Sequence, residues 1–201
     1  ELVLATIGPE TNLALAIKRE PRLRQWVREI TIMGGSTTTG NFSPAAEFNI
    51  AADIEAASVV FESGIPFRMV GYNITRETGF DSNDIERLRA GKTQACVAIA
   101  NLMQFYLNRQ KQMYGLNIAP MHDVCAIIPY VRPDLIDFLY TSARIELTGT
   151  YTRGMTVCDV RHPQGSAEPT LRNRTEPNAQ VAVRAKSRAL IDCVIDTLLT
   201  Y

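Results

Sequence analysis

The chain has 201 residues, of which 46% are apolar and 21% are charged, a composition typical of one globular domain with a sizeable core. Its 21 acidic and 21 basic residues balance, so bulk charge favours neither nucleic acid nor an anionic membrane as a partner. No apolar run approaches the roughly 20 residues of a transmembrane helix. The first residues, ELVLATIG, do not resemble a signal peptide. We therefore expect a cytoplasmic protein in which residues 1–201 form one domain.

Cysteine and histidine usage limits the metal chemistry that the chain can support. The cysteines form no C-x-x-C pair and lie in segments such as ACVAIANL and LIDCVIDTLL, which indicates small core residues of an intracellular protein. They are Cys96, Cys125, Cys158 and Cys193. Only two histidines accompany them, so a structural zinc site is not expected, and any metal should be a hard cation held by oxygen atoms.

Strands and helices alternate in the first part of the chain. Apolar, β-branched runs predict strands in LVLATI (2–7), REITIMGG (28–35) and PFRMVGYNI (66–74). One helix is predicted from Thr11, and a second should follow Asp53, which resembles the N-cap of IEAASVVFES. This order indicates right-handed βαβ units. The predicted fold class is α/β, with a Rossmann-like, mostly parallel sheet flanked by helices on both faces.

The second half predicts further helices and a small β-hairpin. The expected helices are SNDIERLRAG (82–91), TQACVAIANLMQFYLNRQ (93–110), VCAIIPYVRPD (124–134) and SRALIDCVIDTLL (187–199). Pro129 should kink or end the third of them. Alternation in ARIELTG and GMTVCDV predicts an appended hairpin, and AQVAVRA should be a sheet strand. The segments YGLNIAPMHD and RHPQGSAEPTLRNRTEPN are predicted loops, with His162 in the second expected to be exposed and without a role.

The loop from Gly34 to Asn49 is longer than a typical βα connection, which favours a functional loop. Ligands of open α/β sheets lie beyond the carboxyl ends of the strands, where this loop begins. Asn41, Glu47 and Asn49 offer donors and acceptors that suit a polyhydroxylated ligand such as a sugar. The alternative is that these side chains hold the backbone of their own loop.

The pair His122 and Asp123 precedes an apolar helix and also has two interpretations. The aspartate could cap the helix beside a histidine without a role. In the functional interpretation, its oxygen atoms bind a hard cation, beside an imidazole that can donate a proton near neutral pH. The turn IGPETN matches neither G-x-G-x-x-G nor G-x-x-x-x-G-K-[ST], so nucleotide binding is disfavoured.

Together these segments resemble the inosine-uridine-preferring nucleoside hydrolases. The matching stretches, in the family's order, are IGPETNLALA, ITIMGGSTTTGNFSPAAEFNIAADIEAA, VFESGIPFRMVGYNIT, MHDVCAI with VRPDL, and TRGMTVCDVR with NAQVAV. They cover nearly the whole chain, and the combination of M-G-G, N-x5-E-F-N and H-D is specific. The resemblance implies an enzyme that hydrolyses the N-glycosidic bond of ribonucleosides to ribose and free base, assisted by Ca²⁺. It also implies a homodimer or homotetramer.

The resemblance further implies a role for each matching residue. Asn41 and Glu47 would bind the ribose 5′-hydroxyl and Asn49 the side of the diol, with Met33 under the sugar and Phe48 beside it. Asp123 would bind both Ca²⁺ and the sugar, and the backbone carbonyl of Ile7 would be a second Ca²⁺ ligand. His122 would be the candidate general acid beside the base, as in the pyrimidine-tolerant branch of the family.

The family signature D-x-D-x-G-x-D-D does not occur in these 201 residues. Asp123 and one carbonyl cannot supply the six to eight oxygen atoms that Ca²⁺ takes. The first strand also resembles a central strand although it starts at residue 2. We therefore expect an N-terminally incomplete domain that carries the ribose-binding half of the site. The remaining ligands would come from an N-terminal segment, in cis or as a separate fragment. The alternative is a catalytically inactive homologue that binds ribosides or acts as a scaffold.

Overall fold

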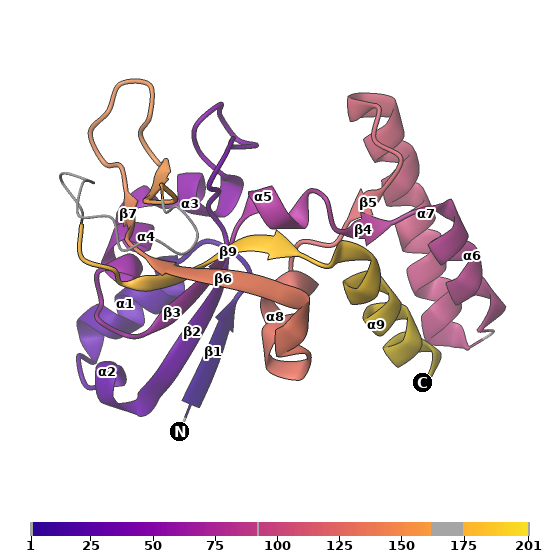
Figure 1. Cartoon of the computed structure of the whole chain (residues 1–201), viewed down its shortest axis with the longest axis horizontal. Coiled ribbons are helices and arrows are strands. Elements are labelled where there is room, and N and C mark those ends of the chain that lie inside the picture. The colour runs from indigo at the N-terminus through magenta and orange to yellow at the C-terminus, as the bar shows by residue number, and fades with distance from the viewer. Residues whose placement is uncertain (1, 92, 162–174, 201) are drawn as a thin grey trace. The chain divides into compact units, whose positions relative to one another are not determined.

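The computed structural model describes residues 2–91, 93–161 and 175–200, and it divides into two compact units (Figure 1). Unit 1 comprises Glu1–Asn73 and Asp137–Arg184, and unit 2 comprises Ile74–Ile136 and Ala185–Tyr201. The single domain expected from the sequence stays a prediction. His162 and most of its predicted loop lie outside the described residues.

The five-stranded sheet places three connecting loops of unit 1 at one edge. In spatial order its strands are β1 (Leu2–Thr6), β2 (Val27–Met33), β3 (Phe67–Val70), β9 (Ala179–Ala185) and β6 (Ile136–Thr141). The pairs β1–β2, β2–β3 and β3–β9 are parallel. Because Thr6 pairs with Ile32, and Met33 pairs with Val70, the carboxyl ends of the first three strands coincide. The loops that follow them therefore begin side by side.

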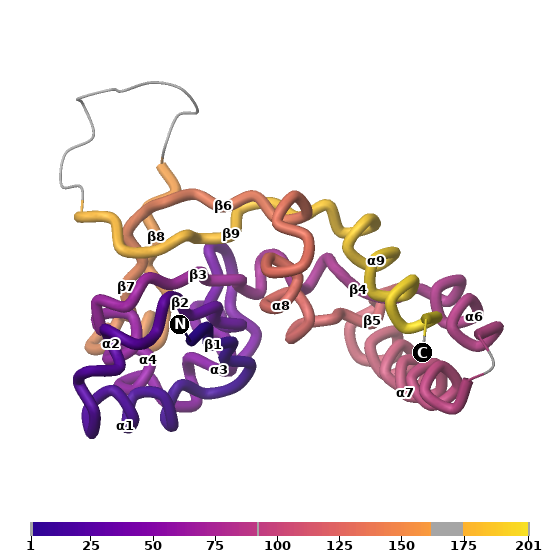
Figure 2. Tube along the Cα trace, turned by 90° about the horizontal axis from the view of Figure 1, so that it is seen from below, coloured from indigo at the N-terminus to yellow at the C-terminus, as the bar shows by residue number. Residues whose placement is uncertain are grey.

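Short helices and a hairpin complete unit 1. They are α1 (Thr11–Arg19), α2 (Leu23–Trp26), α3 (Phe48–Ala52), α4 (Ile54–Phe61), and the antiparallel hairpin of β7 (Ala143–Ile145) and β8 (Thr156–Cys158). Helices α1 and α4 lie together on one side of the strands (Figure 2) and share a core with β2 and β3. As predicted, Asp53 begins α4, because its side chain accepts a hydrogen bond from Ala56 N at 3.1 Å. The predicted α/β class, with its mostly parallel sheet, flanking helices and appended hairpin, is confirmed.

Unit 2 is mainly helical. Its elements are β4 (Gly79–Phe80), α6 (Ser82–Ala90), α7 (Gln94–Tyr114), β5 (Ala119–Pro120), α8 (Val124–Val131), the 3₁₀ turn Pro133–Leu135, and α9 (Ser187–Leu199). The short helix α5 (Tyr72–Thr75) leads from unit 1 into unit 2 along the chain. The four helices predicted for the second half are therefore present. Within the described residues, no helix is both long and apolar enough to cross a membrane.

The structure corrects three expectations about elements. The strand predicted over 66–74 ends at Val70, because the backbone turns at Gly71 and continues as α5. The predicted loop before His122 contains β5, which pairs with β4, and β6 was not predicted at all. Pro129 does not end α8, which continues to Val131. Strand β1 lies at an edge of the described sheet, and its place in the middle of a longer sheet stays a prediction.

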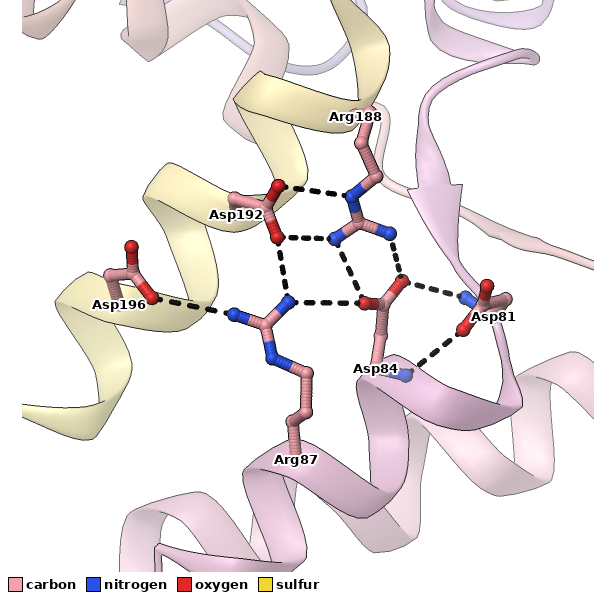
Figure 3. Close-up of polar contacts among 6 residues, drawn as sticks. All are labelled: Asp81, Asp84, Arg87, Arg188, Asp192 and Asp196. Carbon is pink, nitrogen blue, oxygen red and sulfur yellow. Dashed lines mark hydrogen bonds and ion pairs between the residues drawn. The ribbon is translucent and has the colours of Figure 1, made fainter.

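An ion-pair network joins α6 to α9 in unit 2 (Figure 3). Asp84 is buried, with a side chain only 2% exposed, and Arg188 donates to both of its carboxylate oxygens at 2.8 and 2.9 Å. Asp192 accepts hydrogen bonds from Arg188 at 2.8 Å and from Arg87 at 2.6 Å. Asp84 also completes a capping box with Asp81 at the start of α6. The buried carboxylate is thus neutralised by a guanidinium from the neighbouring helix.

Replacing Arg188 by Ala should lower the free energy of unfolding by about 2 kcal/mol, because it leaves Asp84 buried without its bidentate partner. This value is below that for fully buried pairs, since the Arg188 side chain is 53% exposed. Urea unfolding followed by circular dichroism measures it. The matched control is Arg132→Ala, which removes an exposed pair with Asp134 and should change stability by less than about 1 kcal/mol. Equal losses in the two variants would contradict the role given to Asp84.

Candidate active site

Glu47 holds together the two ends of the long loop after β2. Its Oε2 atom accepts hydrogen bonds from Gly35 N at 3.0 Å, Asn49 N at 3.0 Å and Ile50 N at 3.3 Å. The last two bonds make Glu47 the N-cap of α3. Gly35 begins the loop with a φ of 72°, and a Cβ atom there would lie 2.6 Å from Thr156 Cγ2, so no other residue fits. One buried carboxylate oxygen therefore fixes where the loop starts and where α3 begins.

Asn41 and Asn49 also brace this part of unit 1. Asn41 Oδ1 accepts a hydrogen bond from Phe48 N at 2.8 Å. Asn49 Nδ2 donates to the carbonyl oxygen of Met33 at 3.0 Å and lies 3.2 Å from its sulfur atom. The bond to Met33 ties α3 to the last residue of β2. The interpretation in which these side chains hold their own loop is therefore correct for these atoms.

Each of these three side chains has a second polar atom that takes no part in the bracing. Within the described residues, Asn41 Nδ2, Glu47 Oε1 and Asn49 Oδ1 make no hydrogen bond to protein. In that same part of the chain, the one buried side-chain nitrogen or oxygen without a partner belongs to Glu10. Glu47 Oε1 and Asn49 Oδ1 must therefore reach solvent, although both residues are buried overall. The loop uses one polar atom of each residue for structure, and the other has no protein partner within the described residues.

Burial raises the pKa of the Glu47 carboxyl above its ordinary value of 4.5, while hydrogen bonds from the Asn49, Gly35 and Ile50 N–H groups oppose this shift. The N–H dipoles thus favour the anion in a site that otherwise disfavours charge. A carboxylate held in this way has a fixed direction and little water around it, so its electrostatic effect on a nearby positive charge is large.

Apolar side chains frame this polar group. Met33 is buried at the end of β2, and Phe48 is 55% exposed at the start of α3. The Phe48 ring packs against Phe42 with centroids 6.3 Å apart. Ile7 follows β1 at the same edge of the sheet and is half exposed. The structure therefore brings Met33, Asn41, Glu47, Phe48 and Asn49 together around one loop, and it places Ile7 after the neighbouring strand.

In unit 2, His122 and Asp123 precede α8. The Asp123 side chain makes no capping hydrogen bond, so the interpretation of a capping aspartate is wrong. Its carboxylate is exposed. His122 Nδ1 lies 2.7 Å from the hydroxyl oxygen of Thr75. Burial lowers the pKa of His122, opposed by the neighbouring Asp123 carboxylate, so the neutral imidazole is favoured at neutral pH.

A cavity of about 330 Å³ lies beside His122 in unit 2. Its lining residues are Met103, Tyr106, Pro120, Met121, His122, Asp123 and Val124. Met103 and Tyr106 come from α7 and were not singled out from the sequence. Their spacing of three places them on one face of a helix, which was the available signal, but the sequence did not show what that face would meet. The histidine therefore opens onto a space with an aromatic wall.

The residues present do not form a metal site by themselves. Among the described residues, no group of three or more His, Cys, Asp or Glu side chains could hold a metal ion. The two predicted Ca²⁺ ligands fall in different units, Ile7 in unit 1 and Asp123 in unit 2. One carboxylate and one carbonyl do not meet the oxygen coordination of Ca²⁺. Their roles as ligands stay predictions.

Glu10 is a buried carboxyl that sequence reasoning missed. It is 1% exposed at the start of α1, and its Oε1 accepts a hydrogen bond from the Thr6 hydroxyl at 2.6 Å. Its Oε2 has no partner within the described residues. Burial raises the pKa of this carboxyl to about 7, and the bond from Thr6 opposes the shift. Nothing in the local sequence GPETN distinguishes this residue from an exposed glutamate in a turn.

Comparison with known proteins identifies the class to which this fold and site belong. The family model for inosine-uridine preferring nucleoside hydrolases matches residues 1–192. The pyrimidine-specific ribonucleoside hydrolase RihA of Escherichia coli O17:K52:H18 is 36% identical over 201 residues, which are 100% of this chain and 62% of that protein. The chain belongs to the inosine-uridine preferring nucleoside hydrolase family. It spans 62% of the length of this relative.

Two solved structures share the fold. A plant nucleoside hydrolase matches with a TM-score of 0.87 and 27% identity, over 100% of this chain and 63% of that one. A purine-preferring ribonucleoside hydrolase from Gardnerella vaginalis matches with a TM-score of 0.86 and 28% identity, over 99% of this chain and 60% of that one. These likenesses agree with the α/β class derived from the strand order.

We expect Glu10 to make stability depend on pH. Its pKa is raised from 4.5 to about 7 on folding, so its contribution to stability is fully present below pH 4.5 and is lost as pH rises through about 7. The difference between these two values corresponds to about 3 kcal/mol. Glu10→Gln should flatten this part of the profile measured by urea unfolding between pH 4 and 9. Glu62→Gln, which changes an exposed carboxyl, should keep the wild-type profile, and an unchanged profile in Glu10→Gln would contradict the assignment.

Proposed function

We propose that this chain takes part in hydrolysis of the N-glycosidic bond of ribonucleosides, which releases ribose and a free base. The observation that supports this most directly is in the loop after β2, where three side chains each brace the backbone with one polar atom and have a second polar atom without a protein partner within the described residues. Neutral amides and a single carboxylate suit sugar hydroxyls. Membership of the nucleoside hydrolase family supplies the reaction class.

Ribose recognition is assigned to unit 1. Asn41 Nδ2 would donate to the ribose 5′-hydroxyl oxygen, and Glu47 Oε1 would accept its hydrogen atom. Asn49 Oδ1 would accept from the side of the diol. Met33 would lie under the sugar, and Phe48 would lie beside it. Because the opposite polar atoms of the three side chains are already bound to the protein, the ligand-facing atoms are held in place before the sugar arrives.

The carboxylate of Glu47 would assist cleavage of the glycosidic bond. When the glycosidic bond breaks, its electron pair goes to the base and positive charge builds up on the sugar, as in glycoside hydrolysis. An anionic Glu47, fixed by three backbone N–H groups and buried from bulk water, would stabilise that charge. This stabilisation requires no reorganisation of the loop, because the carboxylate is already oriented.

The leaving base is assigned to unit 2. His122 would be the candidate general acid, with Tyr106 as the aromatic wall of the adjoining cavity. The relative from Escherichia coli is named pyrimidine-specific, and the one from Gardnerella vaginalis is named purine-preferring. We therefore propose uridine and inosine as the first substrates to compare. A homodimeric or homotetrameric state and a cytoplasmic location stay predictions.

We also propose Ca²⁺ as the metal, with Asp123 and the Ile7 carbonyl as two of its ligands. A bound Ca²⁺ would coordinate the ribose hydroxyls and lower the pKa of the attacking water. We propose that the other four or more oxygen ligands come from a segment that carries D-x-D-x-G-x-D-D. Within the described residues, no group of three or more acidic, cysteine or histidine side chains could hold a metal ion.

The hydrolysis proposal predicts that the 201 residues alone release little or no ribose from uridine or inosine. Joined to a segment that carries D-x-D-x-G-x-D-D, they should hydrolyse both nucleosides in a reaction that chelation abolishes. In that active form, Glu47→Gln should lower kcat by roughly 100-fold, because the anion is lost where positive charge develops. Glu62→Gln should leave kcat unchanged. Turnover by the 201 residues alone that survives chelation would contradict the Ca²⁺ assignment.

A riboside-binding role without catalysis is the second candidate, because the braced loop of unit 1 is complete within the described residues whereas a metal site is not. It predicts that the chain binds ribose in calorimetry with an affinity that neither Ca²⁺ nor Asp123→Ala changes. In both candidates Asn41→Ala should weaken binding by roughly tenfold, through loss of one hydrogen bond. Asn101→Ala, an exposed amide on α7, is the control and should have no effect. Unchanged binding in Asn41→Ala would remove Asn41 from the site.

A further inference from the structure

We infer that Thr75 is a positioning residue that holds the His122 imidazole in the neutral tautomer with its proton on Nε2. This inference deepens the proposed function, in which His122 acts on the leaving base. Thr75 Oγ1 lies 2.7 Å from His122 Nδ1, although the two residues are 47 positions apart in the chain. Both belong to unit 2, and Thr75 is 0% exposed.

The direction of this hydrogen bond follows from the surroundings of the hydroxyl. A threonine hydroxyl has one hydrogen atom to donate, and within the described residues the Thr75 hydroxyl has one hydrogen-bond partner, the His122 Nδ1 atom. If Nδ1 carried the imidazole proton, the hydroxyl would have to accept it. Its own hydrogen atom would then be buried without an acceptor, which is unfavourable. The hydroxyl therefore donates to Nδ1, and the proton of the neutral ring is on Nε2.

Backbone hydrogen bonds through Thr78 hold the two partners at this distance. Thr78 N donates to the carbonyl oxygen of Thr75 at 3.3 Å, and Met121 N donates to the carbonyl oxygen of Thr78 at 2.7 Å. Met121 directly precedes His122, so the segments that carry the hydroxyl and the imidazole are tied to the same residue. The Thr78 hydroxyl is in turn bonded to the carbonyl oxygen of Ile74 at 3.1 Å and to Ser187 Oγ at 2.9 Å.

Threonine suits this position better than a longer polar side chain. Its β-branched side chain has few χ1 rotamers, so the hydroxyl keeps one direction without further support. The partner that fixes the second nitrogen of a histidine sets the tautomer and the orientation of the ring. With Nδ1 as the acceptor, Nε2–H is the donor that can form a hydrogen bond to a nitrogen or oxygen atom of the leaving base. Such a bond stabilises the negative charge that builds up on the base as the glycosidic bond breaks.

Nitrogen-15 NMR of the full chain measures the tautomer directly, without any need for activity. Two-bond ¹H–¹⁵N correlation spectra distinguish a protonated ring nitrogen from an unprotonated one. The chain has two histidines, so His162→Gln assigns both sets of signals. At a pH where the ring is neutral, we expect His122 in the wild type to have a protonated Nε2 and an unprotonated Nδ1. A proton on Nδ1 would overturn the inference, even if no variant folds.

Two substitutions test whether Thr75 is the cause. Thr75→Val keeps the shape of the side chain but removes the donor, so it should shift His122 towards a mixture of tautomers. Thr75→Ser keeps the hydroxyl and should restore the wild-type spectrum. In the hydrolytically active form, Thr75→Val should lower kcat by roughly 10- to 100-fold with little change in KM, and Thr75→Ser should recover most of it. A folded Thr75→Val with the wild-type tautomer would overturn the inference.

The two proposals fail in different ways. An Nε2–H tautomer in a protein that hydrolyses no nucleoside, even with the D-x-D-x-G-x-D-D segment, would leave the role of Thr75 intact and refute the proposed function. Hydrolysis that depends on His122 but is unaffected by Thr75→Val, with an Nδ1–H tautomer, would support the function and refute the positioning role.

Discussion

The arrangement of unit 1 depends on one carboxylate oxygen. Glu47 Oε2 accepts three backbone N–H groups, from Gly35 at the end of β2 and from the first turn of α3. Gly35 also contacts the connection between β3 and α5. Its carbonyl oxygen accepts a hydrogen bond from the N–H group of Tyr72, the first residue of α5, at 2.7 Å. Gly71 permits this approach, since a Cβ atom there would lie 2.9 Å from the Gly35 oxygen. Removing the carboxylate would therefore disturb the loop, the start of α3 and the exit from two neighbouring strands.

In the proposed function, this constraint lets the same residues serve both structure and ligand binding. A polar loop residue is usually interpreted either as holding the loop backbone or as binding a ligand. Asn41, Glu47 and Asn49 each have two polar side-chain atoms, so each residue can do both. One atom of each is bound to the protein, so the position of the other is determined. A site built in this way needs little reordering on binding, and less of the interaction energy is lost to entropy.

Unit 2 follows the same principle with different chemistry. Thr78 connects the segments of Thr75 and His122 through backbone hydrogen bonds, and the imidazole is oriented by a hydroxyl that has one hydrogen-bond partner in the part of the chain that the structure describes. The acidic and basic side chains of α6 and α9 are engaged with one another around Asp84. The buried charge of this unit is thus balanced within the pair of helices and does not require a ligand.

Features that depend on local patterns could be predicted from the residues alone. Alternating strands and helices gave the α/β class, and Asp53 marked the start of α4, because periodicity and capping involve residues within a turn of each other. The motif around Asn41, Glu47 and Asn49 indicated the family, which the family model confirms. Strand β6 escaped prediction because its segment, IDFLYT, is defined by pairing with β9 from much later in the chain. The residues YNI read as strand by propensity, but the approach of Gly71 to Gly35 turns the backbone there.

The use of individual atoms depends instead on tertiary packing. Several features depend on residues that are distant in the chain. They are the choice of the Glu47 oxygen that is bound to the protein, the burial of Glu10, the position of Tyr106 beside His122 and the hydrogen bond between Thr75 and the imidazole. A sequence pattern shows which side chains are available. The environment that sets their protonation and direction is formed only when the strands and helices pack together, because burial and hydrogen-bond geometry are properties of that packing.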